Sequence, residues 1–248
     1  MLEINHVSKT YAKSAVKAVD DFTLSVRDGE IFGFIGPNGA GKSTTIKMIT
    51  GILHPDEGHI TVGGADVVRE SLTTKRRIGY VPETQDVYDR LTGQEYLNFI
   101  ADIYGVSREA RTKAMEKYLT MFDIENAVGD QLRTYSHGMK QKLLLTAALI
   151  PDPDLWVLDE PLVGLDPKSA HALKQEMRAH CAAGKTVFFS THVLEVAEKL
   201  CDRIAIIDNG KLIAVGSVEE LKRSHDSGNL GGESLESIFL SLTEEADK

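Results

Sequence analysis

Cysteine is scarce in this chain of 248 residues, which contains Cys181 and Cys201 and no others. Two cysteines do not make the framework of several disulfide bridges that stabilises small secreted domains. A reducing compartment such as the cytoplasm therefore fits the sequence better than an oxidising one.

Positive charge is also in short supply, because 28 Lys and Arg residues stand against 37 Asp and Glu residues, for a net charge of −9. Proteins that coat DNA or RNA hold it largely by neutralising phosphates with Lys and Arg. The charge balance argues against a nucleic-acid partner. With 42% hydrophobic and 26% charged residues, the composition is otherwise that of an ordinary globular protein.

Long apolar runs are missing as well. The longest aliphatic stretch, LLLTAALI at 143–150, ends at Pro151, well short of the roughly 20 apolar residues that cross a bilayer as a helix. It is predicted to be a buried helix. The first residues, MLEINHVSKTYAK, carry no basic segment followed by an apolar core, so they do not predict a secretory signal. Any membrane role is expected to come through a partner.

What the sequence does contain is an alternation of short apolar strands and helices, which is typical of a parallel sheet. Between about Leu91 and Ile150 the pattern is helical throughout. We expect an α/β fold with a parallel-sheet core, an N-terminal antiparallel β subdomain and a helical subdomain inserted at about 84–150. The expected elements are strands at 30–36, 155–160, 185–192 and 203–216, a helix at 42–51, and a small hairpin at 59–67 around Gly63 and Gly64.

The segment GPNGAGKST at 36–44 matches the phosphate-loop pattern G-x-x-x-x-G-K-[ST]. Glycines let the backbone curl so that successive N–H groups converge on phosphate oxygens, and the following helix points its positive end at them. Lys42 adds a charge for the β- and γ-phosphates, and the Ser43 hydroxyl can ligate Mg²⁺. A chance glycine-rich turn is the alternative, but a strand before the loop and a helix after it favour nucleotide binding. The predicted nucleotide-binding residues are Gly36, Pro37, Asn38, Gly39, Ala40, Gly41, Lys42, Ser43 and Thr44.

Two adjacent acids, Asp159 and Glu160, end the apolar strand LWVLDE. A strand of a parallel sheet delivers its C-terminal residues to the crevice where ligands bind. Asp159 is predicted to hold Mg²⁺ through water, and Glu160 to orient or deprotonate an attacking water. The alternative is a plain strand end followed by a turn, and the phosphate loop favours the functional interpretation.

Six motifs, in the order in which they occur along the chain, resemble those of the ATP-binding subunit of ABC transporters, and the resemblance covers nearly the whole chain. The phosphate loop is similar to the family's first nucleotide motif, and LWVLDE is similar to its second. YSHGM at 135–139 resembles the signature, usually Leu-Ser-Gly-Gly-Gln, and VGLD at 163–166 resembles the loop after the catalytic glutamate. His192 in STHVLEVAEKLCDR is similar to the switch histidine, and Tyr11 to the aromatic residue that stacks on adenine.

The resemblance implies an ATPase that works as a pair of subunits, in which each ATP lies between the phosphate loop of one and the signature of the other. Ser136, His137 and Gly138 would then contact the ATP bound by the partner chain, aided by the N-terminus of the helix that Ser136 opens. His192 would contact the γ-phosphate beside the catalytic Glu160. Asp166 would carry contacts across the dimer interface.

The sequence departs from the family at the metal site and in the signature. Where the family has a glutamine that approaches Mg²⁺ and the attacking water, the spacing of YVPETQDVYDRLTG puts Glu83. Glutamate can still ligate Mg²⁺, but it adds negative charge near the γ-phosphate. Gln85 is the weaker candidate for that position. The signature carries His137 and Met139 where the family usually has glycine and glutamine.

Three segments resemble the sequences of bacterial exporter subunits for drugs, sodium and peptides. They are YSHGMKQK, the segment around Val87-Tyr88 and the tail SLESIFLSLTE. This implies a separate integral membrane permease, contacted through residues 84–96, and a place on the cytoplasmic face of the cell membrane. Residues 1–224 would form one ATP-binding domain, and 225–248 a polar loop and an amphipathic helix. The apolar face of that helix, predicted to dock on the body or on a partner, contains Leu235, Ile238, Phe239 and Leu242.

Two other functions stay open at this point. One is a soluble ABC-type ATPase in translation or DNA repair, although such proteins usually carry two cassettes or long inserts. The other is an ATP-binding regulatory module in which Glu83 suppresses turnover. A GTPase or kinase is disfavoured, since the sequence has no Asn-Lys-x-Asp guanine reader.

Overall fold

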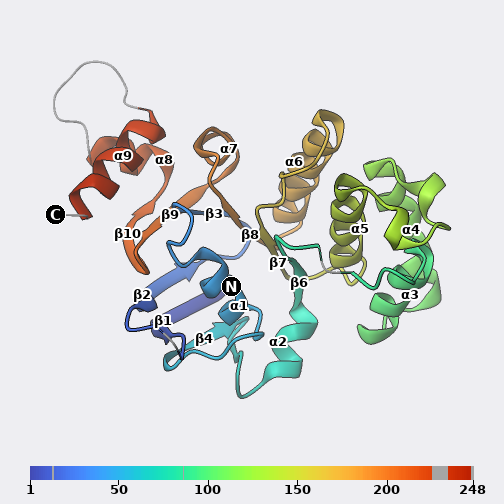
Figure 1. Cartoon of the computed structure of the whole chain (residues 1–248), viewed down its shortest axis with the longest axis horizontal. Helices are drawn as coiled ribbons and strands as arrows, with labels where there is room; N and C mark the ends of the chain where they lie inside the picture. The colour runs from blue at the N-terminus through green and yellow to red at the C-terminus, as the bar shows by residue number, and fades with distance from the viewer. Residues whose placement is uncertain (13, 86, 225–233, 247–248) are drawn as a thin grey trace.

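A six-stranded sheet, in the order β10-β9-β3-β8-β7-β6, forms the core of the described part of the chain (Figure 1). This fold is given by a computed structural model, which describes residues 1–12, 14–85, 87–224 and 234–246. The strands run parallel to one another except β10, which is antiparallel to β9. They are β3 (Ile31–Ile35), β6 (Ile78–Val81), β7 (Leu155–Asp159), β8 (Thr186–Thr191), β9 (Arg203–Asp208) and β10 (Lys211–Gly216).

Strands β3, β7 and β8 are buried along their whole length, as expected for a parallel sheet with both faces covered. Alternate side chains point to opposite faces. In β7, Trp156 and Leu158 pack into a cluster with the large helices, whereas Leu155 and Val157 pack into a second cluster with the N-terminal strands. One sheet thus separates two apolar layers.

The N-terminal part forms a four-stranded antiparallel sheet in the order β2-β1-β4-β5. Between β4 and β5, Gly63 and Gly64 have left-handed φ angles of 57° and 82°, which suits a tight two-residue hairpin turn. The hairpin predicted at 59–67 is confirmed. The four strands are β1 (Leu2–Thr10), β2 (Lys17–Val26), β4 (Glu57–Val62) and β5 (Ala65–Asp66).

Among the described residues, three α-helices lie between β6 and β7 in sequence and beside these strands in space (Figure 1). Each starts at a capping hydroxyl: Thr92, Ser107 and Ser136 accept a hydrogen bond from the N–H three residues on. The last helix is buried from residue 143 to 149, so the predicted buried helix is confirmed, and with it the predicted fold class. The helices are α3 (Gly93–Ile103), α4 (Arg108–Phe122) and α5 (His137–Leu149).

The C-terminal helix docks on the body of the protein. Leu235 and Ile238 are fully buried, and Phe239 packs against the same cluster with residues of α7 and α8. The loop predicted at 225–233 lies outside the described residues. The remaining helices are α1 (Lys42–Ile49), α2 (Ser71–Arg77), α6 (Pro167–Ala182), α7 (Leu194–Leu200), α8 (Val218–Ser224) and α9 (Leu235–Ala246).

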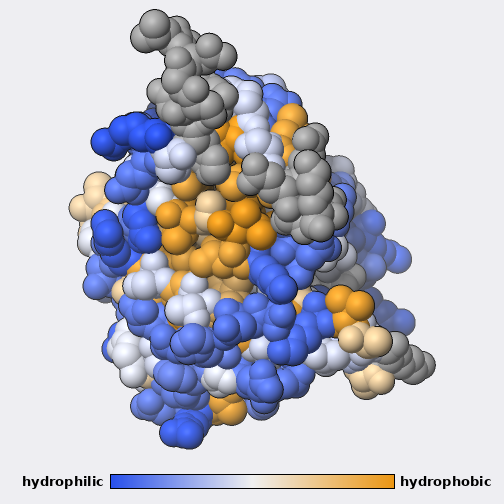
Figure 2. All heavy atoms as spheres, turned by 90° about the vertical axis from the view of Figure 1, so that its left-hand side faces the viewer, coloured by the Kyte–Doolittle hydropathy of each residue, from blue (hydrophilic) through white to orange (hydrophobic). Residues whose placement is uncertain are grey.

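Strand β10 is the edge of the core sheet, and its residues from 211 to 215 are partly or fully exposed. Figure 2 faces this side of the molecule and shows hydrophobic surface gathered at its centre. Within the part of the chain that the structure describes, no helix has the length and apolarity needed to span a membrane.

Candidate active site

Three neighbouring strands bring their carboxyl ends to one edge of the core sheet. β3 runs into the phosphate loop, β7 ends at Asp159, and β8 ends at Thr191, just before His192. In the sheet, Ile35 lies beside Thr191, and Asp159 lies beside Ser190. Three distant parts of the sequence therefore meet in one crevice, the place where open parallel sheets bind ligands.

The loop between β3 and α1 is tight because glycine occupies its most restricted positions. Gly39 and Gly41 have left-handed φ angles of 84° and 106°, which residues with a side chain resist. A Cβ on Gly36 would lie 2.3 Å from the carbonyl oxygen of Ile207 in β9. Helix α1 then begins at Lys42, so its first N–H groups, which have no partner within a helix, border the loop.

Lys42 extends into this loop and is 7% exposed. Its Nζ donates hydrogen bonds to the carbonyl oxygens of Gly36 at 2.7 Å and Pro37 at 3.0 Å. Burial lowers the pKa of Lys42 from its ordinary value of 10.5, and three nearby carboxylates partly offset this effect. Among the described residues these two carbonyls are its hydrogen-bond partners, so one of its three N–H donors is free for an anion.

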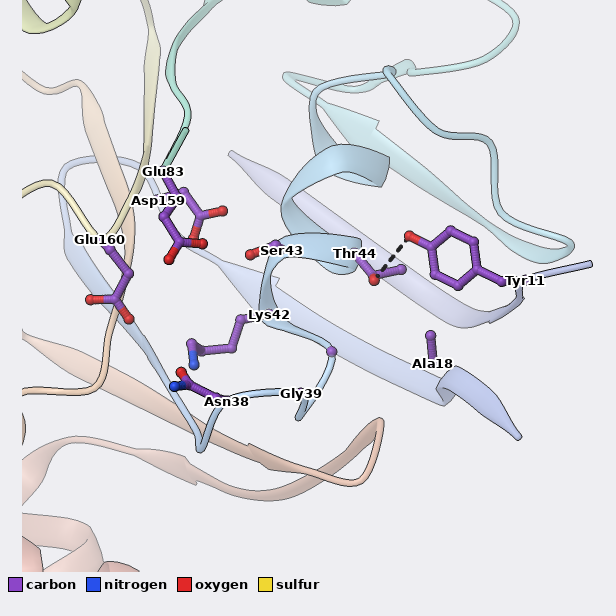
Figure 3. Close-up of a pocket in the computed structure, with 11 residues that line it drawn as sticks. Tyr11, Ala18, Asn38, Gly39, Lys42, Ser43, Thr44, Glu83, Asp159 and Glu160 are labelled. Carbon is purple, nitrogen blue, oxygen red and sulfur yellow. Dashed lines mark hydrogen bonds between the residues drawn. The ribbon is translucent and has the colours of Figure 1, made fainter. Parts of the chain in front are cut away.

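A cavity of about 440 Å³ opens over the loop. Figure 3 shows Tyr11 at one end of it, the pocket carboxylates at the other end, and the phosphate loop between them. The Oη of Tyr11 lies 3.2 Å from Oγ1 of Thr44, and Tyr11 is 45% exposed, which leaves ring surface for a stacked base. The cavity is lined by Tyr11, Ala18, Asn38, Gly39, Gly41, Lys42, Ser43, Thr44, Glu83, Asp159 and Glu160.

Ser190 ties the two adjacent acids of this cavity to β8. Its Oγ donates to Oδ1 of Asp159 at 2.6 Å and accepts from the backbone N–H of Glu160 at 3.0 Å. Glu160 has a left-handed φ of 50°, a conformation that a non-glycine residue keeps only when its surroundings hold it there. Its Oε2 lies 3.0 Å from Nδ1 of His192. A buried carboxylate of the cavity thus faces an exposed imidazole, although His192 itself does not line the cavity.

The cavity has an excess of negative charge, with the carboxylates of Glu83, Asp159 and Glu160 against the one ammonium of Lys42 among its lining residues. A nucleoside triphosphate is itself an anion, so its binding here calls for an accompanying cation. Carboxylate and hydroxyl oxygens, including that of Ser43, are the ligands that Mg²⁺ prefers. The donor set fits the predicted metal.

Comparison with known proteins agrees with this chemistry. The family model described as "ABC transporter" matches residues 19–163. The chain belongs to the ABC transporter family. The linearmycin resistance ATP-binding protein LnrL of Bacillus subtilis is 37% identical over 246 residues, covering 99% of this chain and 77% of LnrL. Nod factor export ATP-binding protein I of Burkholderia orbicola is 38% identical over 223 residues, covering 90% of this chain and 73% of that protein.

Solved structures of the family have the same fold. An ATP-binding subunit of an ABC transporter superposes with a TM-score of 0.92 at 36% identity, covering 98% of this chain and 99% of that one. A dimeric ATP-binding cassette in a post-hydrolysis state, bound to ADP and Pi, superposes with a TM-score of 0.80 at 26% identity, covering 88% and 99%. This chain is an ABC cassette that binds ATP and acts as an ATPase.

The predicted signature of this ABC cassette lies apart from its own phosphate loop. Ser136 caps α5 by accepting the N–H of Met139 at 3.2 Å, which confirms the predicted helix cap. His137 borders a second cavity, of about 660 Å³, together with Glu83. Neither Ser136, His137 nor Gly138 lines the phosphate cavity, and Figure 1 shows α5 and α1 in separate parts of the molecule.

Asp166, which is predicted to serve the dimer interface, has partners within its own chain. Its carboxylate caps α6 by accepting from the N–H of Ser169 at 2.9 Å and from the Oγ of Ser169 at 2.8 Å. It also lies 2.7 Å from Nζ of Lys142 in α5. Hydrogen bonding to Lys142, and then to Ser169, lowers the pKa of Asp166 well below its ordinary value of 3.8. The interface role of Asp166 stays a prediction.

Sequence reasoning missed Ser190 and Ala18. The signal for Ser190 was available, since it is a polar residue at the end of the apolar strand VFFST, just as Asp159 ends the strand before it. Ala18 contributes through its backbone: a Cβ on Gly41 would lie 2.4 Å from the carbonyl oxygen of Ala18. The residue types of the sequence do not reveal a backbone contact of this kind.

Glu83 and Gln85, the two candidates for the predicted position near Mg²⁺, have different surroundings in the structure. Glu83 lines the phosphate cavity, whereas Gln85 does not. The side chain of Gln85 meets His137 and Gln141 instead.

Proposed function

We propose that this ATPase subunit binds ATP together with Mg²⁺, pairs with a second ATP-binding subunit around the nucleotide, and drives a separate membrane permease, for export. The observation that carries the proposal is the cavity in which Lys42 lies between the ring of Tyr11 and the carboxylate of Glu160 (Figure 3). Its length and chemistry suit a nucleotide whose terminal phosphate ends beside a general base.

In the proposed mechanism, Lys42 and the first N–H groups of α1 hold the β- and γ-phosphates. Ser43, Asp159 and Glu83 would hold Mg²⁺, which would supply positive charge to neutralise the phosphates. Glu160 accepts the proton of the water that attacks the γ-phosphate. His192, beside Glu160, contacts the γ-phosphate and helps to fix the attacking water.

The position of the signature supports a paired arrangement. Ser136 and Gly138 begin a helix of 13 residues, whose N-terminal N–H groups and positive dipole end suit an anion. The phosphate cavity of the same chain has no lining residue from this helix. A second subunit placed head to tail would let each signature meet the γ-phosphate held by the other chain, with Asp166 near the contact.

Exposed apolar side chains around α3 support a contact between the permease and the predicted segment 84–96. Tyr88 and Phe99 are 64% and 43% exposed, and their rings meet edge to face with centroids 6.1 Å apart beside a hollow of about 370 Å³. At the other end of α3, Ile103 and Leu72 line a groove of about 350 Å³ and are 60% and 76% exposed. Apolar surface gathered in this way marks an interaction site, and a cytoplasmic helix of a permease would fit it. Such a contact would hold the subunit on the cytoplasmic face of the cell membrane.

The direction of transport is proposed from the relatives, whose names refer to Nod factor export and linearmycin resistance. These names favour export over the alternative of a soluble ATPase in translation or DNA repair. We further propose that residues 1–224 form one ATP-binding domain with the helical subdomain inserted at about 84–150. Residues 225–248 would be a C-terminal loop and a short amphipathic helix, of which the structure describes α9.

The test is copurification of the full chain with the membrane protein encoded beside it, followed by measurement of phosphate release with and without Mg²⁺. We expect an ATPase that depends on Mg²⁺ and is stimulated by the permease. Copurification with ribosomes or DNA would support the soluble alternative. ATP binding without phosphate release, with the permease present, would support a regulatory module in which Glu83 suppresses turnover.

A further inference from the structure

The C-terminal helix α9 packs against the helix that follows His192. Helix α7 begins two residues after His192, at Leu194, and α9 contacts α7, α8 and β9 (Figure 1). Leu235, the first residue of α9, is fully buried in a cluster that also contains Ala197 of α7. The same cluster includes Ile35, the residue just before the phosphate loop. Helix α9 therefore packs against elements that border the candidate active site.

Helix α7 depends on its neighbours for its position. It has seven residues, its N-cap is Val193, and no side chain caps its first turn. A helix this short is marginal by itself and takes most of its stability from tertiary packing. Ala197 belongs to the cluster with α8 and α9, whereas Leu200 belongs to the large cluster with α6 and the helical subdomain. Packing against both clusters thus holds α7 in place.

Helix α8 supports α7 as well. Val218 and Leu221 of α8 lie in the same cluster as Leu235, and Nζ of Lys222 donates to Oε1 of Glu198 in α7 at 2.5 Å. The side chains of this pair are 34% and 30% exposed, and partly exposed ion pairs contribute little to stability. The buried apolar contacts of α8 and α9 therefore contribute more to the position of α7 than this ion pair does.

The position of His192 depends on the backbone between β8 and α7. Its side chain is 56% exposed, and the 3.0 Å contact with Oε2 of Glu160 is its one ion pair or hydrogen bond among the described residues. Toward β8 the backbone is fixed, since Thr191 pairs with Ile35 in the sheet and its Oγ1 accepts from the N–H of Val193 at 3.0 Å. On the other side the backbone leads into α7. A shift of α7 therefore moves His192 relative to Glu160.

We propose that Leu235 is a positioning residue, which holds α7 against the body of the protein and so keeps His192 beside Glu160. The proposal rests on the proposed function, in which His192 contacts the γ-phosphate and helps to fix the attacking water. The phosphate loop should respond less, although Ile35 lies in the same cluster. Ile35 is paired in the sheet with both β8 and β9, whereas α7 is held by side-chain packing.

The test measures ATP turnover and hydrogen exchange in the full chain carrying Leu235→Ala. We expect kcat, counted per site that binds a fluorescent ATP analogue, to fall by about tenfold to 100-fold, the effect of a small misplacement near the chemistry. KM for ATP should stay within about twofold, because the phosphate loop keeps its place. Hydrogen exchange of residues 192–200 should become about tenfold faster, whereas that of α1 should not change. A purely structural role would reduce the number of binding sites and leave kcat per site normal.

Leu240→Ala is the matched control, since it makes the same substitution in the same helix at a side chain that is 52% exposed. It should change neither kcat nor hydrogen exchange. Leu235→Met keeps the apolar volume and should restore kcat to within about twofold of the wild type. If Leu235→Ala does not fold, Phe239→Ala gives the same reading, because Phe239 packs against the same cluster from a half-buried position.

The double variant His192→Ala/Leu235→Ala tests whether Leu235 acts through His192. Adding Leu235→Ala to His192→Ala should leave kcat unchanged, because both changes act through one side chain. A normal kcat per site in folded Leu235→Ala, or an equal further loss in the His192→Ala background, would overturn the role of Leu235 and leave the proposed function intact. Wild-type turnover in His192→Ala would contradict the proposed mechanism itself, and with it the inference that rests on it.

Discussion

His192 Nδ1 lies 3.0 Å from Glu160 Oε2, and the two side chains differ sharply in exposure, at 56% and 7%. A carboxylate can only accept, so a hydrogen bond between the two side chains requires the proton on Nδ1 of the imidazole. Nε2 of His192 would then be left available to a ligand. The pair thus combines a buried carboxylate, the predicted base, with an exposed imidazole beside it.

Replacing Glu160 with glutamine should slow ATP hydrolysis by about 100-fold to 10,000-fold, the usual contribution of a general base. ATP binding should be unchanged, because Lys42 and the loop glycines that hold the phosphates remain. Single-turnover phosphate release measures the first effect, and binding of a fluorescent ATP analogue measures the second. Gel filtration with ATP should show a trapped dimer. The exposed Glu219→Gln is the control, and wild-type turnover in Glu160→Gln would exclude Glu160 as the base.

Replacing Lys42 with methionine should abolish ATP-induced stabilisation and yet raise the melting temperature of the nucleotide-free protein. The pKa of Lys42 is lowered by burial, so its charged form is less favourable in the folded chain than in the unfolded one. Each kcal/mol recovered raises the melting temperature of a protein of this size by about 2–4 °C.

The same lysine predicts a pH dependence. Because the unfolded state holds this proton more tightly, wild-type stability should rise as the pH passes the folded-state pKa of Lys42 and approaches 10.5. This gain should be missing in Lys42→Met and present in a Lys113→Met control, since Lys113 is exposed on α4. Thermal melts without nucleotide across the alkaline range check the prediction, and equal slopes for wild type and Lys42→Met would contradict it.

Replacing Ser190 with alanine should destabilise the fold and impair catalysis together. The change leaves Oδ1 of Asp159 and the N–H of Glu160 without the hydroxyl that joins them, at a cost of about 1–3 kcal/mol for an unsatisfied buried group. Urea denaturation measures the loss, and kcat should also fall because the left-handed Glu160 loses a restraint. Ser25→Ala, in an exposed position of β2, should change neither quantity. If Ser190→Ala lowered stability but left kcat normal, Ser190 would support the fold without aligning Glu160.

The sequence was informative where function depends on short spacing and where burial is periodic. The residues of 36–44, the pair Asp159–Glu160 and the strand before His192 could be placed at one sheet edge because carboxyl ends of parallel strands meet there. The docking of α9 on the body was one of two open possibilities, since the apolar face of a helix does not name the surface it covers.

Contacts between residues far apart in the sequence could not be predicted from spacing or from the periodicity of burial. Gln85 is 56 residues from Gln141, and the pattern around neither glutamine indicates the other. The partner of Asp166 could not be predicted either, because the motif VGLD suggests a functional carboxylate but does not indicate which lysine lies beside it. Lys142 lies in α5, and only the packing of α5 on the loop after the base brings the two together.

Replacing Asp166 with asparagine should weaken the link between α5 and the loop at 163–166 in a way that depends on pH. The pKa of Asp166 is lowered in the folded chain by Lys142 and Ser169, so the stabilisation is fully present above its ordinary value of 3.8 and is lost as the pH falls below it. The difference in unfolding free energy between wild type and Asp166→Asn should be constant from about pH 6 to pH 8, where the carboxyl is ionised in both states, and should shrink in acid. Lys142→Met should lower stability in the same pH range, and the double variant should cost less than the sum, because the two residues share one contact. Strict additivity of the two changes would show that the 2.7 Å contact contributes nothing to the fold, and Asp166 would then be free to act at the subunit interface.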